Sequence, residues 1–400
     1  MAKPKIRFKG YTNDWEQRRL DDMGSTFTGL SGKTKEDFGH GDAQFITYMN
    51  VFSNPLANLE MTEAVEIDSK QSSVKKGDVF FTTSSETPEE VGMSCVMPEN
   101  KDNIYLNSFC FGYRPTVKFD LAYLAYVLRA GSFRKEMIFL AQGISRYNIS
   151  KNKVMEVSIP VPYLDEQTMI GRYFSNIDHL ITLHQRKCDQ AKKLKKYMLQ
   201  KMFPKNNGSV PEIRFEGFSN DWEQRRLGDV FIEYSEKNRT DLPALTIIQG
   251  GGTVKREDSD RNLMYAESNL SNYKMVRKDD FIVHLRSFEG GLEKSSLDGI
   301  ISPAYHTFHS DAADSRFYYP YFRSHEFIKH KLVPHVYGIR DGRSIDIDGM
   351  KTIEMPYTSM EEQKKIGDYL EALDHLITLH QKKCDQLKNL RKFMLQNMFV

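Results

Sequence analysis

The sequence is poor in cysteine, and it lacks the long apolar runs of membrane proteins. Its 400 residues contain four cysteines, none at CxxC spacing, which argues against a disulfide framework and predicts free thiols in a reducing compartment. No stretch approaches the roughly 18 apolar residues that a membrane span requires, and the N-terminal residues have no apolar signal region. We therefore expect a cytoplasmic protein that makes no contact with a membrane.

An excess of one charge and the common catalytic motifs are also missing. Lys plus Arg number 56 and Asp plus Glu 54, a net charge of +2, so any surface that binds nucleic acid must be local. GxSxG, HExxH and the Asn/Asp-Pro-Pro-aromatic motif of amino-methyltransferases are absent, and the loop ending at Gly32-Lys33-Thr34 has Phe27 where a phosphate-binding loop needs glycine. We expect no catalytic residues and no metal site, and interpret the chain as a binding protein.

What the sequence has in abundance is internal similarity. The segment Pro4–Asp22 returns as Pro211–Asp229 with 14 of 19 positions identical. A longer segment, Asp165–Phe203, returns as Glu361–Phe399 with 25 of 39 positions identical. A period near 200 residues is too long for a solenoid, whose repeats are single supersecondary units. The repeat therefore predicts two whole domains, each followed by a shared segment.

The segments between these shared pieces, Met23–Leu164 and Val230–Met360, are barely alike. Both alternate short aromatic and β-branched runs with turn residues, and helical patches interrupt them at Leu121–Met137 and Tyr321–Leu332. The predicted fold class is α+β, with two globular domains joined by two long helices that form an antiparallel coiled coil, related by a pseudo-twofold repeat. The predicted bounds are 1–160 for the first globular domain, 161–204 for the first long helix, 205–212 for a linker, 213–356 for the second globular domain and 357–400 for the second long helix.

The shared segments have apolar residues at three- and four-residue steps, which is typical of a helix with one buried seam. About 35 to 40 helical residues make a rod of about 55–60 Å, and the other copy is its obvious partner. An antiparallel pair would hold the two globules at opposite ends. The predicted pairing seam comprises Ile170, Phe174, Ile177, Ile181, His184, Cys188, Ile366, Leu370, Leu373, Ile377, His380 and Cys384.

Histidine and cysteine lie four residues apart on each seam, as His184 with Cys188 and His380 with Cys384. Two such pairs could supply the four ligands of a tetrahedral zinc site if the helices cross near these turns. The simpler interpretation, which we adopt, is that each cysteine packs as a small apolar residue and each histidine forms a hydrogen bond within the seam.

Two shared segments that carry two different globular domains are suited to binding two different halves of one extended target. Two major-groove sites on duplex DNA lie about 34 Å apart, and a rod of the expected length could straddle them. Arg and Lys side chains can bind guanine edges and phosphates, and Asn can bind adenine. The candidate DNA-binding residues on Gly/Ser-rich loops are Lys33, Lys35, Thr82, Thr83, Ser84, Arg146, Tyr147, Asn148, Arg286, Ser287, Arg340 and Arg343.

Four motifs together resemble a known family. They are WEQRRL at Trp15 and Trp222, KGDVFFTTS at Lys76, the E-Q…I-G…D…L-I…H pattern that begins at Glu166 and Glu362, and the helix ends MLQKMF and MLQNMF. The chain resembles the specificity subunit of type I restriction-modification enzymes over essentially its whole length, and in particular it resembles the staphylococcal-type members.

The resemblance implies a non-catalytic subunit. Each divergent segment would be a target recognition domain that reads one half of a bipartite, asymmetric site on double-stranded DNA, and the helices would set the spacer. The helices would also dock two modification subunits, which bind S-adenosylmethionine and methylate adenine, while restriction subunits use ATP and Mg²⁺. The alternative is a protein-protein scaffold, or a stand-alone enzyme with duplicated ligand-binding domains.

Overall fold

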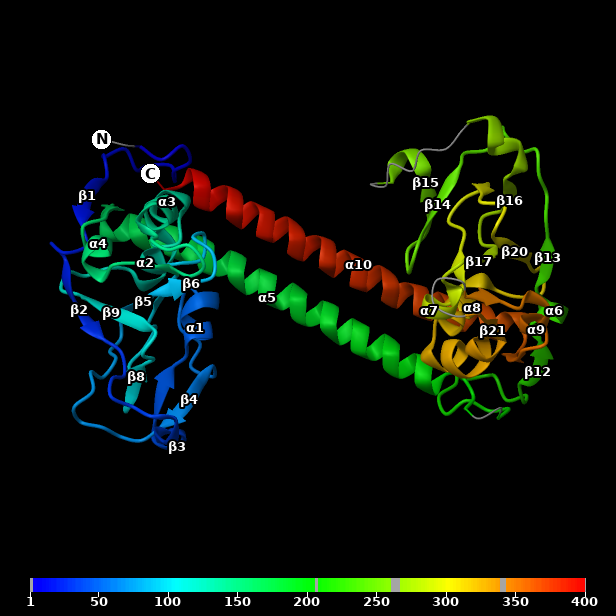
Figure 1. The fold of residues 1–400 in the computed structure, drawn as a ribbon, viewed down its shortest axis with the longest axis horizontal. Coiled ribbons are helices and arrows are strands. Elements are labelled where there is room, and N and C mark those ends of the chain that lie inside the picture. Colours follow the sequence, from blue (N-terminus) through cyan, green and yellow to red (C-terminus); the bar gives the residue numbers. More distant parts are fainter. Residues whose placement is uncertain (1–2, 206–207, 260–266, 339–342, 400) are drawn as a thin grey trace. The chain divides into compact units, whose positions relative to one another are not determined.

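The computed structural model describes residues 3–205, 208–259, 267–338 and 343–399. The chain divides into two compact units (Figure 1). Unit 1 comprises Met1–Gln185 and Lys382–Val400, and unit 2 comprises Arg186–Gln381. Each unit therefore contains one globule and part of each long helix, α5 (Leu164–Lys201) and α10 (Met360–Asn397). Among the described helices, none is long and apolar enough to cross a membrane.

Unit 1 is built around a four-stranded antiparallel sheet in the order β2-β9-β5-β7, beside a three-stranded sheet in the order β4-β3-β8. Its strands are β1 (Glu16–Arg19), β2 (Gly24–Thr28), β3 (Phe38–Ile46), β4 (Thr62–Val65), β5 (Val79–Thr82), β6 (Ser84–Ser85), β7 (Ser94–Val96), β8 (Ile104–Leu106), β9 (Cys110–Pro115), β10 (Tyr147–Asn148) and β11 (Ser158–Val161). Its shorter helices are η1 (Lys35–Asp37), α1 (Tyr48–Ser53), α2 (Leu121–Val127), α3 (Gly131–Leu140) and α4 (Lys151–Met155).

Unit 2 has the corresponding four-stranded antiparallel sheet, in the order β13-β20-β17-β18. Its strands are β12 (Glu223–Arg226), β13 (Ile232–Tyr234), β14 (Leu245–Ile248), β15 (Gly252–Lys255), β16 (Lys274–Val276), β17 (Phe281–Val283), β18 (Glu293–Lys294), β19 (Gly299–Ile301), β20 (His306–His309), β21 (Val336–Tyr337), β22 (Ser344–Ile345) and β23 (Glu354–Tyr357). Its shorter helices are α6 (Leu227–Val230), η2 (Arg256–Asp258), η3 (Glu267–Asn272), α7 (Ser287–Gly290), α8 (Ser315–Phe322), η4 (Phe327–Leu332), η5 (Val333–His335) and α9 (Ile347–Lys351).

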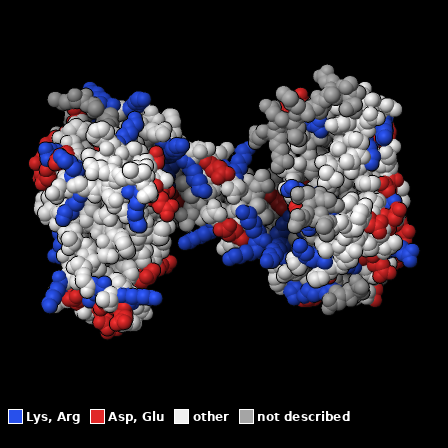
Figure 2. Space-filling model, in the orientation of Figure 1, with Lys and Arg blue, Asp and Glu red and all other residues white. Residues whose placement is uncertain are grey.

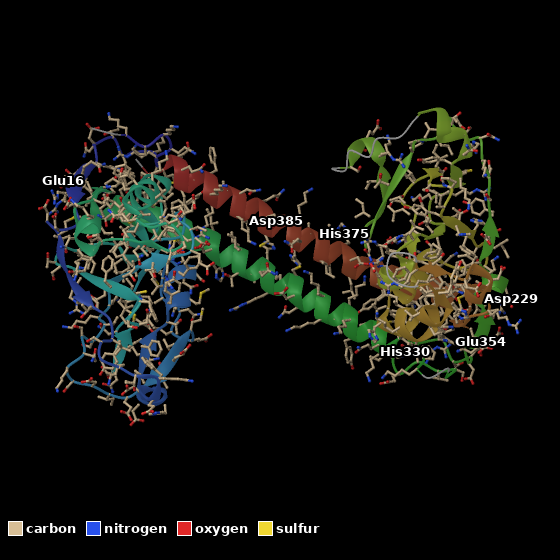
Figure 3. The ribbon with its side chains drawn as sticks, in the orientation of Figure 1. Glu16, Asp229, His330, Glu354, His375 and Asp385 are labelled. Atoms are coloured by element: carbon tan, nitrogen blue, oxygen red, sulfur yellow. The ribbon has the colours of Figure 1, made fainter. Side chains whose placement is uncertain are left out.

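The duplicated lead-in of each unit forms a strand against the residues that precede a long helix. In unit 1, β1 pairs antiparallel with β11, so that Glu16 lies opposite Val161, three residues before α5 begins. In unit 2, β12 pairs in the same way with β23, where Glu354, labelled in Figure 3, lies opposite Arg226. The shared sequence therefore fixes where each long helix leaves its globule.

Within each unit, an early part of one long helix packs against a late part of the other. In unit 1, Asp178 of α5 forms an ion pair at 3.1 Å with Arg391 of α10. In unit 2, Lys195 of α5 donates to Asp374 of α10 at 2.5 and 2.6 Å. The paired segments run antiparallel in both units. Figure 3 labels His375 and Asp385 on α10, one on each side of the boundary between the units.

The two helical patches predicted from sequence are each interrupted. The first is divided into α2 and α3, and Arg129 lies at the break, where its guanidinium donates to the carbonyls of Ser94 and Val51. These buried contacts anchor the chain where one continuous helix was expected. The second begins earlier than predicted as α8, which contains Pro320, and resumes as the separate segment η4.

Candidate nucleic-acid interface

Four of the residues predicted in unit 1 lie together near the end of β5: Ser84, Arg146, Tyr147 and Asn148. The two-residue strands β6 and β10 pair there, with Ser84 opposite Asn148 and Ser85 opposite Tyr147. The Arg146 guanidinium donates to the Ser84 hydroxyl from Nε at 3.3 Å and from Nη2 at 3.2 Å. Residues some 60 positions apart in the chain therefore form one patch, with the exposed Arg146 at its surface.

A hollow of about 260 Å³ opens beside this patch. The Tyr48 hydroxyl donates to the Ser84 carbonyl at 2.8 Å, and the Ser85 hydroxyl donates to a Glu90 carboxylate oxygen at 3.1 Å. This aromatic and acidic wall was not predicted from the sequence, because its residues come from α1 and from a loop that carries no recognisable motif. The lining residues are Tyr48, Met49, Phe52, Ser84, Ser85, Glu86, Glu90 and Arg146.

Two predicted threonines beside the patch have structural contacts. Thr82 is fully buried, and its hydroxyl accepts the Met93 N–H at 2.9 Å, so its side chain is part of the core. The neighbouring Thr83 is half-buried, and its hydroxyl donates to the Phe109 carbonyl at 2.8 Å. Both residues were candidates because of their polar side chains, and composition alone does not distinguish side chains that reach the surface from those that pack inward.

The predicted lysines of unit 1 lie elsewhere. Lys33 Nζ is 3.1 Å from an Asp68 carboxylate oxygen, and this contact raises the pKa of Lys33. Lys35 is exposed on η1, directly before β3. Figure 1 shows β3 at the end of the unit away from β6. The structure therefore does not bring these two lysines to the patch around Arg146.

In unit 2 the predicted residues meet at α7. Arg286 is exposed at the start of this short helix, and its backbone N–H donates to His284 Nδ1 at 3.3 Å. The Arg343 guanidinium lies 4.5 Å from the centre of the Phe288 ring and 3.7 Å from a Glu289 carboxylate oxygen. Unit 2 thus has two arginines around one helical turn.

The other two predictions in unit 2 have different outcomes. Ser287 is fully buried, and its hydroxyl accepts the His284 N–H at 2.9 Å, so it closes the turn before α7. Arg340 lies outside the described residues.

His284 is held as a neutral imidazole. Burial, reinforced by the positive charge of Arg323, lowers its pKa to about 4. Because its Nδ1 accepts the Arg286 N–H, the ring proton lies on Nε2, which is buried and has no partner in the part of the chain that the structure describes. The position equivalent to His284 in the first repeat, 202 residues earlier, is Thr82.

The predicted seam residues line the paired helices within both units. Ile170, Phe174, Ile177, Ile366, Leu370, Leu373, Cys188 and Cys384 are buried, and Ile181, His184, Ile377 and His380 are half-buried. In unit 2 the Cys188 thiol lies 3.8 Å from the Gln381 side-chain oxygen, and in unit 1 the Cys384 thiol lies 3.7 Å from that of Gln185. Across the described ranges, no three His, Cys, Asp or Glu residues are grouped as a metal site requires.

The surface charge of each globule is mixed. Figure 2 shows basic and acidic side chains interspersed over the visible face of each unit. A uniform positive field would favour binding to any nucleic acid, whereas isolated arginines beside shaped hollows favour contacts to particular groups.

Comparison with known families gives a match over most of the chain. The model of the type I restriction modification DNA specificity domain matches residues 12–193 and again residues 219–389. Two relatives from Methanocaldococcus jannaschii are similar in sequence. The putative type I restriction enzyme MjaX specificity subunit is 25% identical, covering 95% of this chain and 91% of its own. The type I restriction enzyme MjaVIII specificity subunit is 27% identical, covering 68% of each chain.

Solved structures show the same fold. The S subunit of a type I restriction-modification system from M. genitalium has a TM-score of 0.62 at 16% identity and covers 100% of this chain and 99% of its own. A chain from a study of assembly and conformational transition in the type I system has a TM-score of 0.54 at 16% identity, covering 96% and 97%. The predicted fold class is confirmed: α+β globules with long, antiparallel helices.

Proposed function

Because the chain belongs to the type I restriction-modification DNA specificity family, we propose that unit 1 and unit 2 each read one half of a bipartite, asymmetric site on double-stranded DNA. The observation that carries this proposal is the double match of the family model, once in each repeat. The chain is a specificity subunit and not itself an enzyme. Catalysis belongs to the subunits with which it assembles.

The two polar patches support different half-sites. In unit 1, Arg146 donates a hydrogen bond to the Ser84 hydroxyl beside a hollow lined by two glutamates. In unit 2, Arg286 and Arg343 flank α7. Base pairs present distinct donors and acceptors in the major groove, so two patches with different donor and acceptor sets select different bases. Of the residues predicted from sequence, we assign base contacts to Arg146, Asn148, Arg286 and Arg343, and structural roles to Thr82 and Ser287.

The long helices carry equivalent exposed apolar residues in the two repeats, which favours the binding of two copies of one partner. Large apolar side chains remain exposed on both helices of each unit, although most residues of the seam between the helices are buried. Such patches are typical of protein interfaces. Four of the exposed apolar residues of α5 have an exposed apolar counterpart 196 positions later, in α10. The four pairs are Leu180 with Leu376, Leu183 with Leu379, Leu194 with Leu390, and Tyr197 with Phe393.

We assign these surfaces to two modification subunits, and the length of the helices to the spacing between the half-sites. The modification subunits would supply S-adenosylmethionine, and restriction subunits would add ATP- and Mg²⁺-dependent activity. The four cysteines are buried free thiols, which suits the reducing cytoplasm in which we place the complex.

The deciding experiment is methylation mapping. The chain is co-expressed with its modification subunit in cells that lack DNA methylation, and the genomic DNA is sequenced by a single-molecule method that detects methylated adenine. We expect a bipartite methylated motif that disappears when this chain is omitted. A purified complex that methylates no motif would contradict the proposal.

Two variants separate the roles of globule and helix. Exchange of residues 23–164 for the segment of another family member should replace one half-site and leave the other intact. Equal insertions in α5 and α10 should change the spacer and preserve both half-sites. A segment exchange that alters both half-sites, or an insertion that leaves the spacer unchanged, would contradict this division.

A further inference from the structure

The hollow beside Arg146 combines hydrogen-bond donors and acceptors on an apolar wall. Arg146 lies at one side, and Glu86 and Glu90 lie in the same lining. The rings of Tyr48 and Phe52 are stacked, with centroids 6.1 Å apart and an interplanar angle of 17°. A carboxylate that faces DNA is repelled by the phosphates, so its presence needs a specific donor on the DNA.

The arginine is oriented for recognition. Two of its nitrogens, Nε and Nη2, donate to the Ser84 hydroxyl, and Ser84 is itself held by the Tyr48 hydroxyl and by its pairing with Asn148. This support restrains the guanidinium plane. Its outer edge, formed by the two terminal nitrogens, has the geometry that binds guanine O6 and N7 in a bidentate manner.

The two glutamates have different surroundings. Glu90 is half-buried and accepts the Ser85 hydroxyl, which places it at the back of the hollow. Glu86 is exposed and lies next to Ser85 in the chain. Cytosine presents its 4-amino group as a donor in the major groove, and a carboxylate accepts from it. Glu86 is therefore the acceptor available to a base.

We propose that the hollow lined by Arg146 and Glu86 reads one G·C base pair in the half-site of unit 1, with Arg146 donating to guanine and Glu86 accepting from cytosine. This inference rests on the proposed function and adds a base identity to it. Ser84 and Glu90 are positioning residues, because they hold Arg146 and Ser85. In unit 2, the position equivalent to Ser84 is Arg286, so the second half-site is read by different chemistry.

The test measures methylation rates of the complete complex on a panel of duplexes. Each duplex carries one of the four base pairs at one position of the half-site assigned to unit 1 by the segment exchange. We expect the wild-type complex to require G·C at one position, and Glu86→Gln to reduce its preference for G·C there by roughly ten- to a hundred-fold. Arg146→Gln should reduce the same preference, at the same position.

Glu63→Gln is the matched control, since Glu63 is an exposed carboxylate of the same unit on β4, outside the hollow. It should retain the wild-type profile. A Glu86→Gln profile equal to that of the wild type, or a uniform decrease on all duplexes, would overturn the inference while leaving the proposed function intact. A wild-type complex that methylates no duplex would instead contradict the proposed function.

Discussion

In both units a buried glutamate at the start of a long helix binds the same two partners from the lead-in. Glu166 accepts two N–H groups of Arg7, at 2.7 and 2.8 Å, and the Trp15 indole N–H at 3.1 Å. Glu362 accepts those of Arg214, at 2.6 and 2.8 Å, and the Trp222 indole N–H at 3.0 Å. The repeat therefore preserves a buried ion pair where the lead-in is attached to the helix.

The units differ where the divergent segment meets the paired helices. In unit 1 the Tyr126 hydroxyl donates to Asp178 at 2.7 Å. The corresponding Tyr321 of unit 2 is 6% exposed, and its hydroxyl has no hydrogen-bond partner among the described residues, while Asp374 is bound by Lys195. The contacts between lead-in and helix are thus the same in both units. The divergent segments differ in how their tyrosine contacts the paired helices.

The largest expected effect tests what the units share. Glu166→Ala should lower the free energy of unfolding by about 3–5 kcal/mol, because it leaves the Arg7 guanidinium and the Trp15 N–H buried without their acceptor. Glu362→Ala should cost a similar amount. Urea denaturation measures both, and Glu16→Ala, which removes an exposed carboxylate of β1, is the control with little effect. A loss below about 1 kcal/mol in either unit would show that the shared ion pair is not what secures the lead-in.

The next effect concerns a group that unit 2 has and unit 1 lacks. The pKa of His284 is about 4 in the folded chain, below the value near 6.5 expected when unfolded. Its neutral form therefore contributes full stability above about pH 6.5, and this contribution is lost as the pH falls towards 4. After allowance for its partial exposure, we expect a loss of about 2 kcal/mol.

The measurement compares the wild type with His284→Thr, which introduces the residue found at the equivalent position of unit 1. The free energy of unfolding is measured at pH 7 and pH 4.5 for each protein. Because both proteins have the same carboxylates, the difference between their pH-dependent losses is due to His284. The wild type should lose more stability on acidification than the variant. Equal losses would mean that His284 remains solvated and that the units do not differ in this respect.

The lead-in and the long helices of each unit could be predicted from sequence because their sequence occurs twice in the chain. Both copies repeat the seam spacing and the lead-in, and the four buried apolar positions of each seam follow from helical periodicity alone. Ser84, Arg146 and Asn148 were each named as candidates because they lie on loops rich in glycine and serine, but their meeting in one patch was not predicted, and Ser84 is buried. Periodicity cannot decide which of several adjacent polar residues points inward, so the burial of Thr82 and Ser287 was not predicted.

The acidic wall of the hollow could not be predicted. Tyr48 lies on α1 and Glu86 in a loop after β6, and their meeting with Arg146 depends on the pairing of β6 with β10. Two-residue strands have no alternation to detect. Likewise, the ion pair of Lys33 with Asp68 joins residues 35 positions apart, which nothing in their local sequence indicates. Tertiary contacts of this kind determine which charges remain available for DNA.

A smaller effect distinguishes the two equivalent tyrosines. Tyr126→Phe removes a hydrogen bond to a carboxylate and should destabilise unit 1 by about 1.5–2 kcal/mol. Tyr321→Phe removes a buried hydroxyl without a partner among the described residues, so it should be neutral or slightly stabilising. Urea denaturation of the two single variants measures the contrast. Equal losses would indicate that water or a rearranged side chain satisfies Tyr321, and that the junctions are equivalent.

The smallest effect is expected at the ion pairs between the helices, Asp178 with Arg391 and Asp374 with Lys195. Asp374 is 50% exposed and Asp178 is 28% exposed. Exposed pairs contribute about 0–1 kcal/mol and are weakened by salt. Lys195→Met should therefore cost less than about 0.5 kcal/mol, and Arg391→Met somewhat more, because Asp178 is more buried and also binds Tyr126. Unfolding at low and high salt checks both. If Lys195→Met lowered the free energy of unfolding more than Arg391→Met, the more exposed ion pair would be the stronger one. Burial would then not explain the difference in strength between the two ion pairs.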